Sequence, residues 1–143
     1  MDVKLPANCT CFNLRKAARA LSQAYDEALK PSGLRGTQFS LLVVVEGRGP
    51  AGVSELARAM VMDRTTLTRN LKPLLAQGLL EVVDGPDRRR RPIAITDRGR
   101  DAIAAALPMW QQAQTRVVKA LGKTRWSGLL ADLDETVRLS QSV

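Results

Sequence analysis

The chain has 143 residues, of which 45% are hydrophobic and 25% are charged, and it carries a formal net charge of +8 at pH 7. These proportions are typical of one globular domain, and the positive excess favours a polyanionic partner, either nucleic acid or an anionic membrane. The absence of histidine excludes histidine-based metal sites and histidine-dependent catalytic triads, and the 3% of aromatic residues disfavours a base-stacking platform for single strands.

Residues 1–8 are predicted to form a loose arm without the apolar core of a signal peptide. No apolar run approaches the roughly 18 residues that a membrane span needs. We therefore expect a cytoplasmic protein that does not associate with membranes. The cysteines, Cys9 and Cys11, suit that compartment and offer no disulfide framework, and we expect no cofactor and no metal site.

The first two predicted helices differ in how clearly their residues specify them. A long helix is predicted over about residues 9–30, because its apolar residues recur at helical spacing before a Pro-Ser-Gly stop at 31–33. A second helix is expected to start at a Thr37 cap. Its run at 41–45 suits a buried strand equally well by propensity, but we interpret it as helix because no neighbouring segment offers a strand partner.

The middle of the chain has the pattern of two short helices in tandem. A helix is predicted over residues 53–60 with Gly52 at its cap, and Asp63 then caps a helix that runs to Gly78. Such a tight connection predicts a helix-turn-helix whose second helix enters the major groove of DNA. Pro73 is expected to kink that second helix beyond the two turns that would touch DNA.

A hairpin is predicted directly after the second helix. Strand-like segments at 79–83 and 93–95 flank a turn at 84–87 and four consecutive arginines at 88–91. Residues 64–100 contain nine basic and four acidic side chains, which gives +5 for this part of the chain. A run of charged residues commonly forms only a solvent-exposed surface, but here the run lies in a hairpin turn beside a basic helix face. This coincidence favours DNA binding.

The expected DNA contacts follow from side-chain reach. The start of the second helix would meet base edges, neighbouring polar and basic residues would hold phosphates, and arginines at the hairpin tip would enter the minor groove, with Asp87 orienting Arg89. The predicted base contacts are Arg64, Thr65, Thr66 and Arg69; the predicted phosphate contacts are Ser54, Thr68, Lys72, Arg90 and Arg91; the predicted minor-groove residues are Arg88 and Arg89.

Long amphipathic helices are also predicted at the C-terminus. Thr96 and Asp97 would cap one that bends at Pro108 and ends at Gly122, and a last helix begins at about Thr124. The core at 37–95 is too small to cover the long helices at both ends of the chain. A second copy is therefore predicted to cover them, giving a homodimer with an isologous interface.

The expected fold is mainly α with a small β-hairpin wing (α+β), a winged helix-turn-helix with long N- and C-terminal dimerisation helices. We divide it into an N-terminal arm and dimerisation helix at 1–36, a DNA-binding core at 37–96 and C-terminal dimerisation helices at 97–143, intertwined as a single domain.

The chain resembles the MarR family of bacterial winged-helix regulators over nearly its whole length. The resemblance implies a dimer bound to a pseudo-palindromic operator. A ligand or oxidant would shift the spacing of the two reading heads, which are the DNA-binding cores of the two subunits. It also places the family's Asp-x-Arg wing motif on Asp87 and Arg89. The motifs that carry it are Glu55-Leu56-Ala57, residues 63–69, Gly78-Leu79-Leu80, Asp87-Arg88-Arg89 and residues 95–99.

A further resemblance, to the organic-hydroperoxide-sensing branch of that family, falls on residues 11–14, Tyr25 and Gln38. In that branch a cysteine near the start of the first helix is oxidised, and two tyrosines hydrogen-bond it. The resemblance places this cysteine at Cys11 and one tyrosine at Tyr25, whereas Gly36 stands where the second tyrosine belongs. The alternative role for Cys11 is a small packing residue near the dimer seam.

A small-molecule effector is the competing signal. In the family its pocket lies between the terminal helices and the winged core. Here Arg15, Gln38 and Trp110 are the predicted lining, with Arg15 offering a fork for a carboxylate. Trp110 is open to a second interpretation, as a core or interface residue.

These patterns predict a dimeric, sequence-specific DNA-binding transcriptional regulator. The resemblance implies that it acts as a repressor, which a small molecule or oxidation at Cys11 releases from its operator. The alternative is a nonspecific architectural DNA- or RNA-binding protein, which would not prefer one inverted repeat over bulk DNA. An enzyme is disfavoured because the chain has no histidine, no glycine-rich phosphate loop and no paired carboxylates in a plausible cleft.

Overall fold

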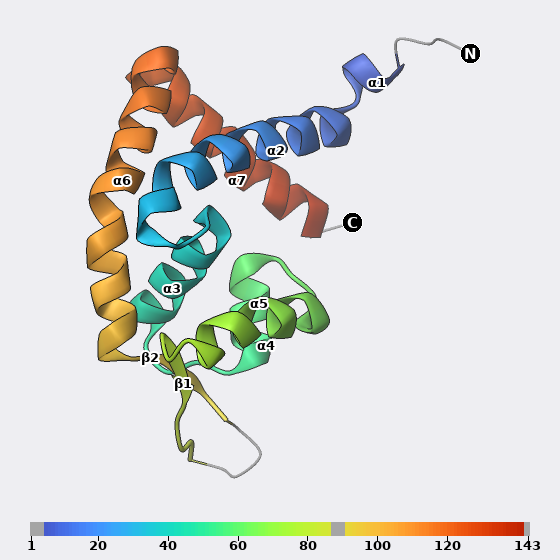
Figure 1. Cartoon of the computed structure of the whole chain (residues 1–143). Coiled ribbons are helices and arrows are strands. Elements are labelled where there is room, and N and C mark those ends of the chain that lie inside the picture. The colour runs from blue at the N-terminus through green and yellow to red at the C-terminus, as the bar shows by residue number, and fades with distance from the viewer. Residues whose placement is uncertain (1–4, 87–90, 142–143) are drawn as a thin grey trace.

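The structure is a computed structural model that describes residues 5–86 and 91–141 (Figure 1). The described part is mainly helical, with one antiparallel hairpin, as the sequence predicts. None of its helices is long and apolar enough to cross a membrane. In chain order the elements are α1 (Leu5–Asn8), α2 (Thr10–Leu29), the short 3₁₀ helix η1 (Lys30–Ser32), α3 (Gly36–Arg48), α4 (Val53–Met60), α5 (Arg64–Ala76), β1 (Leu80–Val82), β2 (Ile93–Ile95), α6 (Asp97–Leu121) and α7 (Lys123–Gln141).

The hydrophobic core lies mainly between α3, α4, α5 and the hairpin. Helix α5 contributes Leu67, Leu71 and Leu74, spaced so that all three face inward, and each is at most 2% exposed. Burying one leucine side chain stabilises a fold by about 1.5–3 kcal/mol, so these three fix which face of α5 remains outside. Their main core partners are Leu29, Phe39, Leu41, Leu42, Val45, Leu56, Leu80, Ile93 and Ile95.

The ambiguous run at 41–45 lies inside α3, which confirms the helix interpretation. Leu41, Leu42 and Val45 are buried, whereas Val43 is 43% exposed, a pattern that a helix produces and an alternating strand does not. The predicted cap at Thr37 is wrong, because α3 begins at Gly36.

The helix starts before Thr37 because a side chain of its own first turn bonds back to the residue that precedes it. The side chain of Gln38 accepts a hydrogen bond from the amide of Arg35 at 3.0 Å, so Arg35 is the N-cap residue. Thr37 therefore lies within the first turn of α3.

The hairpin pairs Leu80 with Ile95 and Val82 with Ile93, in a shorter ladder than the predicted 79–83. Ala51, just before α4, adds a third short segment to this sheet. Its amide donates to the carbonyl of Ile93 at 3.0 Å, and it accepts from the Ile93 amide at 2.8 Å. The base of the hairpin is therefore bonded to the start of the helix-turn-helix.

The terminal helices lie at the opposite end of the molecule from the hairpin, joined to it by the long column of α6 (Figure 1). Helix α2 packs against α6, and α6 against α7. The predicted loose arm is wrong in its last part: residues 5–8 form α1, which the Asn13 side chain holds by donating to the carbonyl of Ala7 at 2.9 Å. Helices α5 and α6 continue through Pro73 and Pro108 respectively.

Candidate nucleic-acid interface

The outer face of α5 is basic and polar. Leu67, Leu71 and Leu74 are buried, while the charged side chains of the helix lie on its other face and are exposed. No acidic residue lies on α5 itself. A short helix with this composition presents hydrogen-bond donors at the width of a DNA groove. The exposed residues of this face are Arg64, Thr65, Thr68, Arg69 and Lys72.

The start of α5 is capped by Asp63, as its position before the helix predicts. One carboxylate oxygen accepts from the amide of Thr66 at 3.1 Å, and the other accepts from the Thr66 hydroxyl at 2.5 Å. These bonds stabilise the charged carboxylate and lower the pKa of Asp63. The half-buried Thr66 hydroxyl, a predicted base contact, therefore donates to the cap in this structure, and its contact with a base edge stays a prediction.

The turn between α4 and α5 contains a backbone conformation that L-residues rarely adopt. Val61 has a φ of +53°, and it is 58% exposed. The turn is closed by hydrogen bonds from the amides of Val61 and Met62 to the last carbonyls of α4. Because β-branched side chains fit this region poorly, the turn stores backbone strain directly before α5. Ser54, a predicted phosphate contact, is exposed in the first turn of α4.

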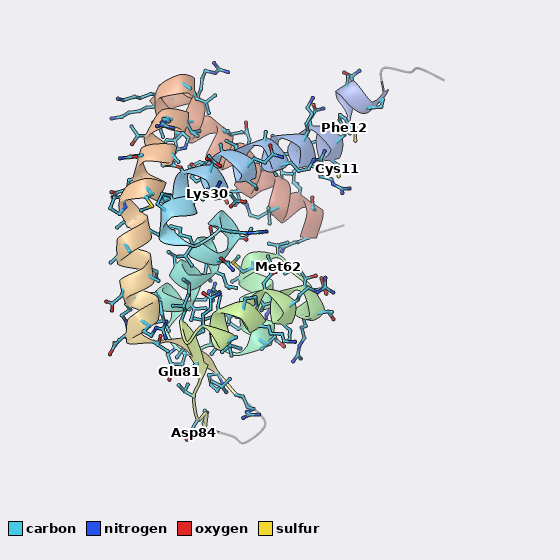
Figure 2. The ribbon with its side chains drawn as sticks, in the orientation of Figure 1. Cys11, Phe12, Lys30, Met62, Glu81 and Asp84 are labelled. Atoms are coloured by element: carbon cyan, nitrogen blue, oxygen red, sulfur yellow. The ribbon has the colours of Figure 1, made fainter. Side chains whose placement is uncertain are left out.

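The hairpin extends from the body next to the helix-turn-helix, with Glu81 on its first strand and Asp84 beyond it (Figure 2). Pairing continues past the strands, since the Val83 amide donates to the carbonyl of Pro92 at 2.9 Å. Arg91, a predicted phosphate contact, is exposed at the start of the returning arm. The remaining predicted wing residues, Asp87, Arg88, Arg89 and Arg90, lie outside the described residues.

Helix α6 is seated tightly on the base of the hairpin. The Thr96 hydroxyl donates to the carbonyl of Gly78 at 2.6 Å and accepts from the amide of Gly99 at 3.0 Å. Gly99 packs so closely that an added Cβ would lie 2.2 Å from the carbonyl oxygen of Leu79. These contacts join the end of the helix-turn-helix to the helix that carries the terminal region.

Part of the basic excess is structural. Arg100, which contributes to the +5 of residues 64–100, forms ion pairs with Glu46 at 3.1 Å and with Asp97 at 3.0 Å. The hydrogen bond and charge of Glu46 raise the pKa of Arg100. Arg100 therefore ties α6 to α3, and the charge left for a polyanion concentrates on α5 and the hairpin.

The structure separates two residues that the hydroperoxide resemblance groups together. Cys11 is exposed near the free end of α2 (Figure 2), and Tyr25 lies 14 residues further along the same helix, about 21 Å away at 1.5 Å per residue. The Tyr25 hydroxyl donates instead to the side chain of Gln114 at 2.5 Å, and burial raises its pKa. Within one protomer, Tyr25 does not reach Cys11.

A cavity of about 450 Å³ lies between α2, the start of α3, the α4–α5 turn and α6. Of the predicted pocket and sensor residues, Trp110 and Tyr25 line this cavity, whereas Arg15 and Gln38 do not. The side chain of Gln38 is used in the α3 cap. Periodicity could not predict the remaining lining, because it comes from elements far apart in sequence. The full lining is Ala18, Leu21, Ser22, Tyr25, Asp26, Gly36, Thr37, Ser40, Met60, Met62 and Trp110.

The described residues include no group of three or more cysteine, aspartate or glutamate side chains placed to hold a metal ion. Cys9 and Cys11 both lie within the described residues, and both are free thiols. The outer face of α5 can offer donors to a polyanion, and the cavity has room for a small molecule.

Comparison with known proteins gives consistent matches. A sequence model described as MarR family matches residues 32–91. The transcriptional regulator MosR of M. tuberculosis, solved in complex with DNA, is 40% identical, with 94% of this chain and 98% of that chain covered and a TM-score of 0.86. A variant of MarR from E. coli in complex with operator DNA has the same fold at 20% identity, with 95% of this chain and 99% of that chain covered and a TM-score of 0.84.

Among curated proteins, the regulator TtmR of Methylorubrum extorquens is 35% identical over 91 residues, which is 63% of this chain and 47% of TtmR. The chain thus matches about half the length of this curated relative. Both TtmR and MosR are named as transcriptional regulators.

Proposed function

The chain belongs to the MarR family of DNA-binding transcriptional regulators, and we propose that it is a dimeric repressor whose two α5 helices read an inverted-repeat operator. The observation that carries the proposal is the exposed, acid-free face of α5, held outward by the buried leucines beneath it. The residues that would meet base edges are Arg64, Thr65, Thr66 and Arg69, and those that would hold phosphates are Ser54, Thr68, Lys72 and Arg91. Asp87 and residues 88–90 keep their predicted wing roles. The chain is not proposed to be an enzyme.

The exposed apolar face of α7 supports dimerisation. None of the residues described in this helix is buried in the single chain. Leu129 is 40% exposed, Leu133 36% and Val137 41%, and their spacing places them along one side of the helix. A contiguous apolar face of this kind is covered most simply by the same face of a second copy, through a two-fold axis. Two α5 helices held in this way would fit half-sites about one helical turn apart.

Competition binding tests the proposal. Lys72→Ala should weaken binding to every duplex alike and lower the slope of log K against log salt by about two, one for each subunit of the dimer. Arg69→Ala should weaken the preferred site by about 10- to 100-fold more than bulk DNA, since it removes a base contact. Lys123→Ala removes the same charge at the far end of the molecule and should change neither quantity. Equal affinity of the wild type for an inverted repeat and bulk DNA would favour a nonspecific architectural protein.

Release by an effector is proposed to act through the cavity. Met60 and Met62, which flank the strained Val61, both line it. Met62 also accepts a hydrogen bond from the side chain of Asn70 on α5, with 3.6 Å between nitrogen and sulfur. A ligand pressing on this wall would move the start of α5, and a small rotation of the two reading heads is enough to lose register with the operator.

Oxidation at Cys11 is the second proposed signal, favoured by its exposure near the free end of α2. Its thiolate would attack an organic hydroperoxide, forming an S–O bond to give a sulfenic acid while the O–O bond breaks and an alkoxide leaves, which takes a proton from water to become an alcohol. Cys11→Ser should abolish any release of DNA by hydroperoxide, measured by fluorescence anisotropy, whereas Cys9→Ser should preserve it. An unchanged response in Cys11→Ser would end this idea.

A further inference from the structure

The charge of the cavity wall is set by one residue. Asp26 is the sole charged side chain in the lining, and it is half-buried. One of its carboxylate oxygens accepts from the amide of Gly36 at 2.7 Å. No ion pair with Asp26 occurs among the residues that the structure describes. A ligand that covers this carboxylate must replace lost water with a compensating group.

The carboxylate also occupies the place where a negatively charged ligand would bind. Gly36 is the first residue of α3, and the free amides at the start of a helix attract anions. Asp26 takes that position with the protein's own charge. An incoming carboxylate would meet a like charge, whereas an amino group would meet an opposite one.

The rest of the wall suits a flat apolar body. Trp110 is held by stacking on Phe39, with ring centroids 6.1 Å apart. Met60 and Met62 add thioether sulfur, which packs favourably against aromatic rings, and an aromatic face also attracts cations. The Tyr25 hydroxyl already donates to Gln114, so it offers no free proton to a ligand anion.

We propose that this cavity binds a cationic molecule with a flat apolar body, whose amino group pairs with Asp26, and that it discriminates against carboxylates. The proposal rests on the proposed function, since it names the chemical class of the effector that would act at this wall. It reverses the sequence-based expectation that Arg15 would hold a carboxylate, because Arg15 is not part of the lining.

Isothermal titration calorimetry at pH 7 with three probes of the same ring system tests this inference: naphthylmethylamine, naphthalenemethanol and naphthoate. The amine should bind the full-length wild-type protein about tenfold more tightly than naphthoate, with the alcohol between them, because Asp26 attracts the ammonium group and repels the carboxylate. Asp26→Asn keeps an oxygen for the Gly36 amide but removes the charge. In this variant the amine should bind no more tightly than the alcohol.

Glu27→Gln is the matched control. Glu27 is the adjacent residue, exposed and outside the cavity lining, so removing its charge should leave the preference for the amine intact. Naphthoate binding as tightly as the amine, an amine preference that survives Asp26→Asn, or no binding of any probe at millimolar concentration would each overturn the inference. Selective DNA binding by the ligand-free wild type is measured in parallel, and its absence would overturn the proposed function whatever the calorimetry shows.

Discussion

The contact between α6 and the hairpin predicts that Gly99→Ala is strongly destabilising. A Cβ at this position would lie 2.2 Å from the carbonyl oxygen of Leu79 and 2.6 Å from Cγ1 of Ile95. Because unstrained contacts of this kind are about 3.5 Å long, α6 or the hairpin base must move by roughly 1 Å. The same Leu79 oxygen accepts from the Thr96 amide at 3.2 Å, so the movement also weakens that bond.

The size of the effect follows from these two losses. Overpacking of a close contact costs about 1–3 kcal/mol, and a weakened hydrogen bond adds about 1 kcal/mol. We therefore expect Gly99→Ala to lower the free energy of unfolding by about 2–4 kcal/mol. Since the contact also seats the hairpin, DNA affinity should fall in any fraction that remains folded.

Urea denaturation at one fixed protomer concentration measures the change, because the stability of a dimer depends on concentration. Gly47→Ala is the control: it makes the same substitution in α3, where an added Cβ meets nothing within 4 Å. That variant should be more stable than the wild type by about 0.5–1 kcal/mol. A Gly99→Ala protein within about 0.5 kcal/mol of the wild type would refute the argument from close packing.

Three further predictions concern the turn, the cap and the dimer. Val61→Gly should raise the free energy of unfolding by about 0.5–1 kcal/mol, because glycine adopts the left-handed conformation without strain. The control, Val43→Gly in α3, should lower the free energy of unfolding by about 1 kcal/mol. Urea denaturation of both variants measures the two changes. Asp63 has a lowered pKa in the folded state, so the stability from its charge is complete above the unfolded value of 3.8 and is lost as pH falls through the lower folded value. The stability difference between wild type and Asp63→Asn should therefore shrink between about pH 5 and pH 2, and a constant difference would contradict the role of the charge. Leu129→Asp combined with Leu133→Asp should yield monomers with little operator affinity by sedimentation velocity, and a fully active dimer would rule out the α7 interface.

Local patterns predicted most of the fold. The sequence around α5 contains a signal at each end, Asp63 before it and Gly78 after it, and the structure confirms the cap and the left-handed turn, in which Gly78 has a φ of +71°. The helical interpretation of residues 41–45 held because no strand was available to pair with them. The start of α3 was misplaced because Gln38 caps it through a side chain, which hydrophobic spacing does not report.

The cavity and the seating of the hairpin were not predictable in the same way. Asp26 accepts a hydrogen bond from Gly36, which lies beyond the end of its helix, and Ala51 pairs with Ile93, which lies 42 positions further along the chain. Such contacts depend on how whole elements pack, and neither composition nor periodicity encodes them. The bond from the Thr66 hydroxyl to Asp63 is likewise visible only in the geometry, because the sequence indicates the cap but not the side chain that adds to it.

The most direct test is selection of bound duplexes from a random pool, followed by affinity measurement on the enriched sequence. Paired α5 helices predict an inverted repeat with half-site centres about 10–10.5 base pairs apart, bound at least about a thousandfold more tightly than bulk DNA. Arg64→Ala combined with Arg69→Ala should remove that preference. A pool that stays random after repeated selection, or an enriched sequence that the double variant binds equally well, would contradict DNA reading by the outer face of α5.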